Sequence, residues 1–190
     1  MPGIKWTHYP KDQPPNEIAL KIVEAFEKNS KEIDSEIHGK GGSNEEKTTF
    51  NSNYVLAKLS SDLKNIQGME IEEKDENGKT KRLSVAILYG NEGKKEKTYA
   101  PDGWHENEGL LLEIEGALKI TQNKIHIYDL FKACLIHNVD HFVIAAAKTW
   151  KVESKKTPIF PYDEIVKEYN AIYESSRFII PIKSITVIGY

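Results

Sequence analysis

PDGWHENEGLLLEIEGA, residues 101–117, is the stretch that is most informative about the fold. It contains a strand that should be buried and acidic residues next to that strand. Asp102 follows a proline, and eleven residues later Glu113 and Glu115 flank a single isoleucine, Ile114. The GLLL run before them is almost continuously apolar, which is typical of a strand covered on both faces. Because side chains alternate along a strand, the two glutamates should share one face and Ile114 should lie on the other.

A hairpin of this length can bring Asp102, at the end of the preceding strand, beside Glu113. Three carboxylates then meet at one sheet edge, where repulsion would raise their pKa values. A divalent cation relieves this conflict, and Mg²⁺ binds a few carboxylates together with water. Such a site suits the hydrolysis of phosphate esters. The alternative is a set of solvent-facing acids on an ordinary strand, which the cost of a free charge beside an apolar run disfavours.

The composition fits one soluble globular domain, since 39% of the 190 residues are hydrophobic and 29% are charged. The net charge of −3 disfavours a strongly basic nucleic-acid coat protein but allows a nuclease with one basic face. Cys134 is the only cysteine, which excludes an intramolecular disulfide and a cysteine-based zinc site. No apolar run reaches about 18 residues and no secretory signal begins the chain, so a cytoplasmic protein is expected.

The first half of the chain predicts an arm followed by two helices. Residues 1–15 contain four prolines and are expected to form an irregular N-terminal arm, with a single domain over residues 16–190. From Asn16, a suitable N-cap, apolar residues recur with a period near 3.6. Ser52 or Asn53 would cap the second helix.

The period then changes to two, which predicts a meander of strands. A hairpin with Asn77-Gly78 at its tip should join the first two strands. The predicted strands span residues 69–74, 82–90, 98–104 and 109–117. The lysines of EGKKEK, Lys94, Lys95 and Lys97, are interpreted as part of an exposed turn, and residues 38–48 as an exposed loop that could bind DNA.

The second half alternates helices and strands. An amphipathic helix is predicted over residues 124–137, with Ile127, Leu130, Phe131, Cys134 and Leu135 facing the core. A strand over 141–147, a helix over 161–176 beginning at Pro161, and a strand over 184–190 follow. The whole pattern indicates one α/β domain with a mixed sheet and helices on its faces.

Asp102 in PDGW and Glu113 in EIE, on a hairpin followed by a helix and a strand, resemble the PD-(D/E)xK nuclease core. The resemblance covers roughly residues 16–190 and implies a restriction-endonuclease-like mixed central sheet flanked by helices. The family usually has lysine two residues after the acid, whereas this chain has Glu115. A glutamate there is similar to the BamHI/BglII-like (D…ExE) branch of the type II restriction endonucleases.

The resemblance implies a catalytic set of Asp102, Glu113 and Glu115. Asp102 and Glu113 would hold Mg²⁺, for which Mn²⁺ could substitute, and the backbone carbonyl of Ile114 would be a further metal ligand. Glu115 would orient or deprotonate the attacking water, and Lys119 is the alternative lysine at this step. The family often draws one more acid from the N-terminal helix or first strands, and the candidates left open are Glu24, Glu70 and Glu72.

The implied activity is Mg²⁺-dependent hydrolysis of double-stranded DNA by a type II site-specific restriction enzyme, with a cognate DNA methyltransferase encoded nearby. Cutting both strands favours a homodimer, through either the helix 124–137 or the helix 161–176. A repair or junction nuclease on the same core, and a non-catalytic DNA-binding or interaction module, are the alternatives. The lysines that could contact DNA phosphates are Lys119, Lys148, Lys151, Lys155 and Lys156. The alternative is that they are solvated surface lysines.

Overall fold

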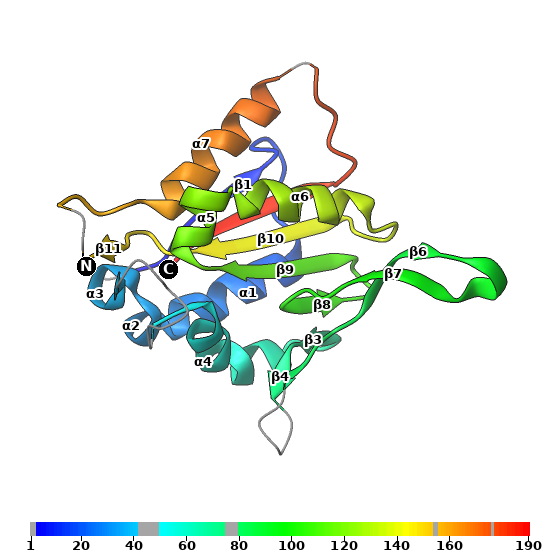
Figure 1. Cartoon of the computed structure of the whole chain (residues 1–190), viewed down its shortest axis with the longest axis horizontal. Helices are drawn as coiled ribbons and strands as arrows, with labels where there is room; N and C mark the ends of the chain where they lie inside the picture. The colour runs from blue at the N-terminus through cyan, green and yellow to red at the C-terminus, as the bar shows by residue number, and fades with distance from the viewer. Residues whose placement is uncertain (1–2, 42–49, 75–79, 154–155, 176) are drawn as a thin grey trace.

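A six-stranded mixed sheet with strand order β1-β12-β10-β9-β8-β3 forms the centre of the molecule (Figure 1). The computed structural model describes residues 3–41, 50–74, 80–153, 156–175 and 177–190. In the sheet, β9, β10 and β12 run parallel, whereas the pairs β1–β12, β8–β9 and β3–β8 are antiparallel. The strands are β1 (Lys5–Tyr9), β3 (Met69–Ile71), β8 (Gly103–His105), β9 (Leu110–Glu115), β10 (His141–Ala146) and β12 (Ser184–Gly189).

Helices cover both faces of this sheet, as Figure 1 shows. The helices on one face are α1 (Glu17–Lys28), α2 (Ser30–Ile33), α3 (Ser35–His38) and α4 (Ser52–Lys64). Those on the other face are α5 (Ala117–Asn123), α6 (Ile125–Leu135) and α7 (Pro161–Glu174). The predicted α/β class, a mixed sheet flanked by helices, is therefore confirmed. None of the described helices is both long and apolar enough to cross a bilayer.

Strand β9 agrees with its prediction as a strand covered on both faces, since all six of its residues are buried. Leu112 packs into the core on the α1–α4 side, and Leu111 packs into the core on the α5–α7 side. An apolar strand between two helical layers removes both rows of side chains from water, which is the dominant favourable term in folding.

Helix starts follow capping chemistry closely. Asn16 caps α1 as predicted, because its side-chain oxygen accepts hydrogen bonds from the N–H groups of Ile18 and Ala19. Helix α4 is capped by Asn51, not by Ser52 or Asn53, so that prediction was one or two residues late.

The expected irregular N-terminal arm is wrong for residues 5–9, which form the edge strand β1. β1 pairs antiparallel with β12, with Trp6 opposite Ile188, and Tyr9 is buried. The four prolines misled the prediction, because all of them lie outside the strand. An extended segment of five residues is enough to pair with an otherwise open sheet edge.

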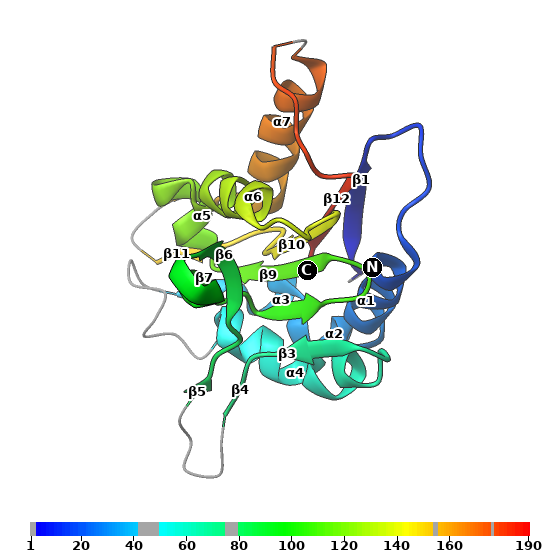
Figure 2. The same cartoon turned by 90° about the vertical axis from the view of Figure 1, so that its right-hand side faces the viewer.

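The hairpin predicted around Asn77-Gly78 forms in part, because β4 (Glu73–Lys74) and β5 (Thr80–Lys81) pair antiparallel on either side of the predicted turn. The returning strand predicted over residues 82–90 does not continue this pair. Its residues form β6 (Val85–Tyr89), which pairs with β7 (Lys95–Tyr99) in a second ribbon (Figure 2). The β6–β7 turn contains the short 3-10 helix η2 (Asn91–Gly93). Closing so short a loop costs less conformational entropy than closing a longer loop. The predicted tip Asn77-Gly78 lies outside the described residues.

The predicted strand 98–104 is interrupted. Residues 95–99 belong to β7 and residues 103–105 to β8, and Pro101 and Asp102 lie between them. Proline lacks the N–H that a strand ladder needs, so it ends the first strand. Asp102 therefore sits immediately before β8, at the end of the sheet where β8 begins.

The predicted helix 124–137 exists as α6, and its predicted buried face is right in part, since Leu130 is buried and Cys134 packs against the core. Ile127, Phe131 and Leu135, expected in the core, are 37%, 57% and 44% exposed. The buried face carries His126 and Asp129, together with Leu130 and Ala133. Helix α5, which precedes α6 directly, was not predicted.

Lys148 is buried and does not lie on a DNA-facing surface, so its predicted role as a phosphate contact is wrong. Its ammonium group lies 2.9 Å from Oδ1 of Asp34 and donates to the carbonyl of Gly3 at 2.5 Å. Beyond it, β11 (Lys151–Val152) pairs with β2 (Lys40–Gly41). Lys155 and residues 42–49 of the predicted loop 38–48 lie outside the described residues.

We expect Lys148→Ala to lower the free energy of unfolding by ~3–5 kcal/mol, because it leaves the Asp34 carboxylate buried without its cation. The matched change Lys151→Ala removes an exposed lysine of β11 and should stay within ~0.5 kcal/mol of the parent. Urea denaturation of the three proteins measures both values. Equal stability of the two variants would show that the buried ion pair is not a structural one.

Candidate metal centre

Asp102, Glu113 and Glu115 are directed to the same face of the sheet. In the β8–β9 pair Trp104 lies opposite Leu111, and both pack on the α5–α7 side. Alternation then places Asp102, two residues before Trp104, and both glutamates on that side as well. The three acids line one cleft, as expected, but Asp102 does not belong to the close group of carboxylates, which contains the two glutamates.

The three acids line an open cleft of about 440 Å³ between the sheet, α5 and α6. Glu113 and Glu115 are only 4% and 7% exposed, whereas Asp102 is partly exposed. Carboxylates this far removed from water lose hydration free energy unless a cation or a proton compensates for it.

A fourth acid in the cleft, Asp129 of α6, was missed from the sequence. It is 1% exposed. One oxygen of each of Glu113, Glu115 and Asp129 lies within 4.8 Å of the other two, which is close enough for one cation to join them after a small closure. Two oxygens on the same Mg²⁺ lie at most about 4.2 Å apart. The pattern IHIYDLF did not reveal Asp129, because its apolar residues indicated a different inward face.

Hydrogen bonds hold these acids from both sides. The backbone N–H of Ile114 donates to Oδ2 of Asp102 at 2.7 Å, just past the last β8–β9 pair at Gly103. Since the N–H and C=O of one strand residue point to the same side, the Ile114 carbonyl also lies on this side, where it was expected to bind metal. The hydroxyl of Tyr99 lies 2.6 Å from Oε1 of Glu113 and 3.3 Å from Oδ1 of Asp129.

Burial and mutual repulsion raise the pKa values of the acids in this cleft. Burial raises the pKa of Asp102 to about 7, although the Ile114 N–H opposes the shift. Burial and the Asp129 carboxylate raise the pKa of Glu115 to about 8. The pKa of Glu113 is raised well above its ordinary value by burial and by its neighbours Asp102 and Asp129.

The donor set fits a hard divalent cation. Oε2 of Glu115 and Oδ2 of Asp129 are buried and accept no hydrogen bond within the described part of the chain. All the candidate ligands are oxygens, which Mg²⁺, Mn²⁺ and Ca²⁺ prefer to nitrogen or sulfur. A cation bound by these oxygens would offset the repulsion that raises the pKa values.

Three basic side chains line the same cleft: Arg82, Lys119 and Lys132. The ammonium group of Lys119 lies 3.7 Å from Oε2 of Glu115, so this lysine reaches back toward the motif. Lys132 lies 3.1 Å from Oδ1 of Asp129. The cleft therefore combines acidic side chains with basic side chains around them. This combination suits a ligand that carries negative charge and also binds metal.

Of the other predicted acids, Glu72 lines the cleft, and its backbone N–H donates to the carbonyl of Asp102 at 2.8 Å. Glu24 and Glu70 are exposed and are not among the described residues that line it. Lys151 and Lys156 are exposed as well, and neither belongs to the described lining.

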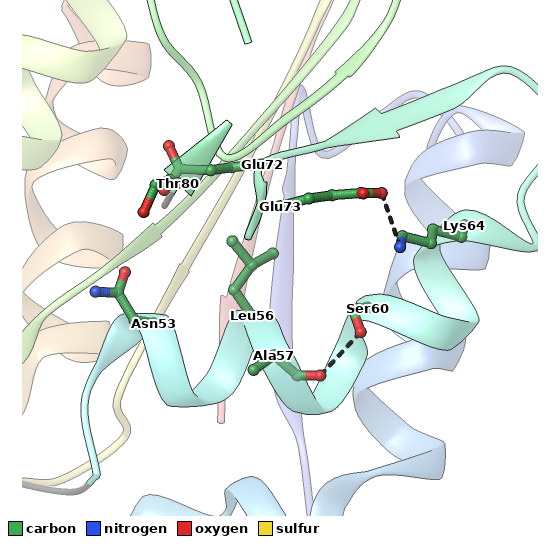
Figure 3. A pocket seen from close by; sticks show the side chains of 8 residues that line it. All are labelled: Asn53, Leu56, Ala57, Ser60, Lys64, Glu72, Glu73 and Thr80. Atoms are coloured by element: carbon green, nitrogen blue, oxygen red, sulfur yellow. Dashed lines mark hydrogen bonds and ion pairs between the residues drawn. The ribbon is translucent and has the colours of Figure 1, made fainter. Parts of the chain in front are cut away.

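A second groove, of about 320 Å³, lies between α4 and the β4–β5 ribbon (Figure 3). Asn53 and Glu72 line both this groove and the acid cleft, so the two hollows are adjacent. In Figure 3 these two residues lie at one end of the groove, and Lys64, paired with Glu73 at 2.7 Å, lies at the other. The surface beside the acids therefore carries a second hollow with polar groups along it.

We expect the metal-free protein to lose stability as pH rises from about 4 to about 8. Asp102 and Glu115 retain protons in the folded state up to pKa values of about 7 and 8, against 3.8 and 4.5 ordinarily. The folded state then binds more protons than the unfolded state, so the unfolding free energy falls with pH. In EDTA, Tm at about pH 8 should be lower than at about pH 5.5 by more than ~4 °C.

Added Mg²⁺ should restore Tm at the higher pH and have little effect at the lower pH, since protons compete with the metal. Glu115→Gln should flatten the pH dependence, whereas Glu106→Gln, at an exposed position, should preserve it. A Tm that is constant or rises over this pH range would contradict the account of a repelling buried cluster.

Known proteins give no independent indication of what this cleft does. No protein-family model matches the chain. No curated protein and no solved structure matches it either. The geometry and chemistry of the cleft are therefore the basis for a functional proposal.

Proposed function

We propose that the protein is a Mg²⁺-dependent endonuclease that hydrolyses phosphodiester bonds of double-stranded DNA, in the manner of a type II restriction enzyme. The observation that carries the proposal is the group of buried acids at the C-terminal end of β9, with two carboxylate oxygens that accept no hydrogen bond within the described residues. Buried carboxylate oxygens without a hydrogen-bond donor are costly, and a metal ion would give these two oxygens a function as well as a ligand.

Asp102 and Glu113, with the carbonyl of Ile114, are the proposed metal ligands, and Asp129 joins them from α6. A divalent cation there supplies charge stabilisation for the phosphoryl group during in-line displacement. Tyr99 keeps its proton, because burial and the nearby Glu113 raise the pKa of its phenol. Its hydroxyl therefore donates toward the carboxylates and holds Glu113 in place.

Glu115 is the proposed acceptor of the proton from the attacking water. The water oxygen bonds to phosphorus, the bond from phosphorus to the 3′ oxygen breaks, and the released 3′ oxygen takes a proton from solvent. The products then carry a 5′ phosphate and a 3′ hydroxyl. Lys119, 3.7 Å from Glu115, would balance the negative charge that grows at the phosphate. In this proposal Glu115 is the base and Lys119 has an electrostatic role.

The charge pattern supports a nucleic-acid substrate. Arg82, Lys119 and Lys132 beside the acids can pair with phosphates adjacent to the scissile one. The adjacent groove along α4 offers Asn53 and Ser60, which belong to the side-chain types that commonly contact the DNA backbone.

We further propose that the active form is a homodimer joined through α6, because cleavage of both strands needs two sites. The outer face of α6 exposes Tyr128, Phe131 and Leu135, at 57%, 57% and 44%. The exposed positions of α7 carry mainly polar residues, Asp163 and Lys167 among them, which makes it the poorer of the two candidate faces. A DNA methyltransferase encoded nearby would be the natural companion of such an enzyme.

We expect Asp102→Asn and Glu113→Gln each to abolish Mg²⁺-dependent plasmid cleavage, because each removes a proposed metal ligand. Glu115→Gln should reduce the rate by ~10²–10⁴-fold, the usual contribution of a general base. Cleavage of supercoiled plasmid and of genomic DNA, with sequencing of the cut ends, measures activity, site and overhang together.

Glu24→Gln and Glu70→Gln are matched controls, since both acids are exposed and lie outside the described lining of the cleft. They should leave cleavage unchanged. A parent protein that cuts no DNA with Mg²⁺ or Mn²⁺ would rule out the proposal, and so would full activity of Asp102→Asn.

A further inference from the structure

The β6–β7 ribbon (residues 85–99) stands away from the body of the molecule, as Figure 1 shows. Its two strands pair with each other and with no strand of the six-stranded sheet. Every residue of β7 except Tyr99 is exposed, and Leu88 and Tyr89 of β6 are exposed as well. A two-stranded ribbon has little stability of its own in water, so projecting one is costly unless something binds it.

The ribbon and the residues leading into it are basic in an acidic protein. Residues 80–99 contain five basic and two acidic residues, a net charge of +3, while the whole chain carries −3. The lysines at the turn and on β7 are Lys94, Lys95 and Lys97. Lys94 contacts Glu92 at 2.9 Å, but a pair this exposed contributes little and can exchange for another anion.

The ribbon also presents apolar groups to solvent. Leu88 and Tyr89 are 51% and 62% exposed. Across the ribbon, Leu88 lies opposite Lys97 and Tyr89 lies opposite Lys95. Lysines of β7 therefore lie beside apolar residues of β6, a combination suited to a partner with charged and apolar parts.

The base of the ribbon is anchored at the acid cleft. Tyr99, the last residue of β7, bonds Glu113 and approaches Asp129 through its hydroxyl. Lys132 of α6 lies over the Tyr99 ring, 4.2 Å from its centroid. Val85 pairs with Tyr99, and Val85 and Ile87 pack against the core on the α5–α7 side. The position of the ribbon relative to the proposed catalytic residues is therefore fixed by packing.

We propose that the β6–β7 ribbon is a nucleic-acid-binding arm that lies in a groove of duplex DNA while the scissile phosphate enters the acid cleft. This inference rests on the proposed nuclease function. Each strand has five residues and spans about 16 Å, roughly half a turn of DNA. The major groove, about 12 Å wide, admits a two-stranded ribbon.

The two kinds of group take different parts in this contact. Lys94, Lys95 and Lys97 neutralise phosphates along the groove, which releases counterions and makes binding depend on salt. Leu88 and Tyr89 meet base edges and sugars, where apolar contact is favourable and independent of salt. Salt dependence therefore separates the two contributions.

The test is binding of fluorescein-labelled duplex DNA in EDTA, followed by anisotropy over a range of salt concentrations. The triple variant Lys94→Ser, Lys95→Ser, Lys97→Ser should bind at least ~10-fold more weakly at about 100 mM salt. Its plot of log affinity against log salt should be shallower by about 2–3 units, near 0.9 for each lost phosphate contact. Tyr89→Ser should weaken binding with the salt slope unchanged.

A matched triple variant, Lys5→Ser, Lys31→Ser, Lys167→Ser, removes the same charge from exposed positions on β1, α2 and α7. It should bind DNA as the parent does. Equal weakening in both triple variants would reduce the effect to overall charge and overturn the inference. A ribbon variant that keeps parental affinity and changes the oligomeric state would overturn it too, by assigning the ribbon to contacts between copies.

Asp102→Asn separates this inference from the nuclease proposal. It should bind duplex DNA in EDTA at least as tightly as the parent, since its ribbon is intact and one carboxylate beside the scissile phosphate is lost. Manganese-dependent hydrolysis of bis(p-nitrophenyl) phosphate, which is too small to reach the ribbon, should survive in the ribbon variants and vanish in Asp102→Asn. Loss of small-substrate hydrolysis in the ribbon variants would overturn the assignment of the ribbon to DNA alone.

Discussion

The placement of carboxylates on a buried strand is the constraint on which the remainder of the structure depends. β9 lies between two helical layers, so every side chain it carries is withdrawn from water. Glu113 and Glu115 are there at the strand end where apolar residues would be expected, and burial raises the pKa of both. A fold that keeps such groups needs protons, a cation or both to compensate them.

Neighbouring elements are arranged around that constraint. Helix α6 buries Asp129 close to the glutamates together with His126, Leu130 and Ala133, while Ile127, Phe131 and Leu135 are exposed. Helix α5 begins directly after β9 and returns Lys119 to Glu115. The β6–β7 ribbon ends at Tyr99, whose hydroxyl bonds Glu113. Neighbouring elements thus supply both a further acid and partners for the glutamates.

Sequence patterns predicted the parts of this arrangement that depend on local rules. Alternation and an apolar run located β9 and set Asp102, Glu113 and Glu115 on one face, and capping chemistry located Asn16. The sequence patterns failed where residues far away in the sequence determine which side chains are buried. Asp129 was missed because the hydrophobic pattern of α6 favours a different inward face, which the acids of β9 override. In the sequence, Lys148 cannot be told from a surface lysine. The folded chain places it beside Asp34, with which it forms an ion pair.

The central claim is that the acids around Glu113 form a divalent-cation site, and a crystal structure grown with Mn²⁺ tests it most directly. The account predicts an anomalous peak within about 2.3 Å of oxygens from Glu113 and from Asp102 or Asp129. It also predicts that the peak disappears in Glu113→Gln. A fully occupied lattice with no manganese in this cleft, and with the carboxyl groups hydrogen-bonded to one another instead, would contradict it.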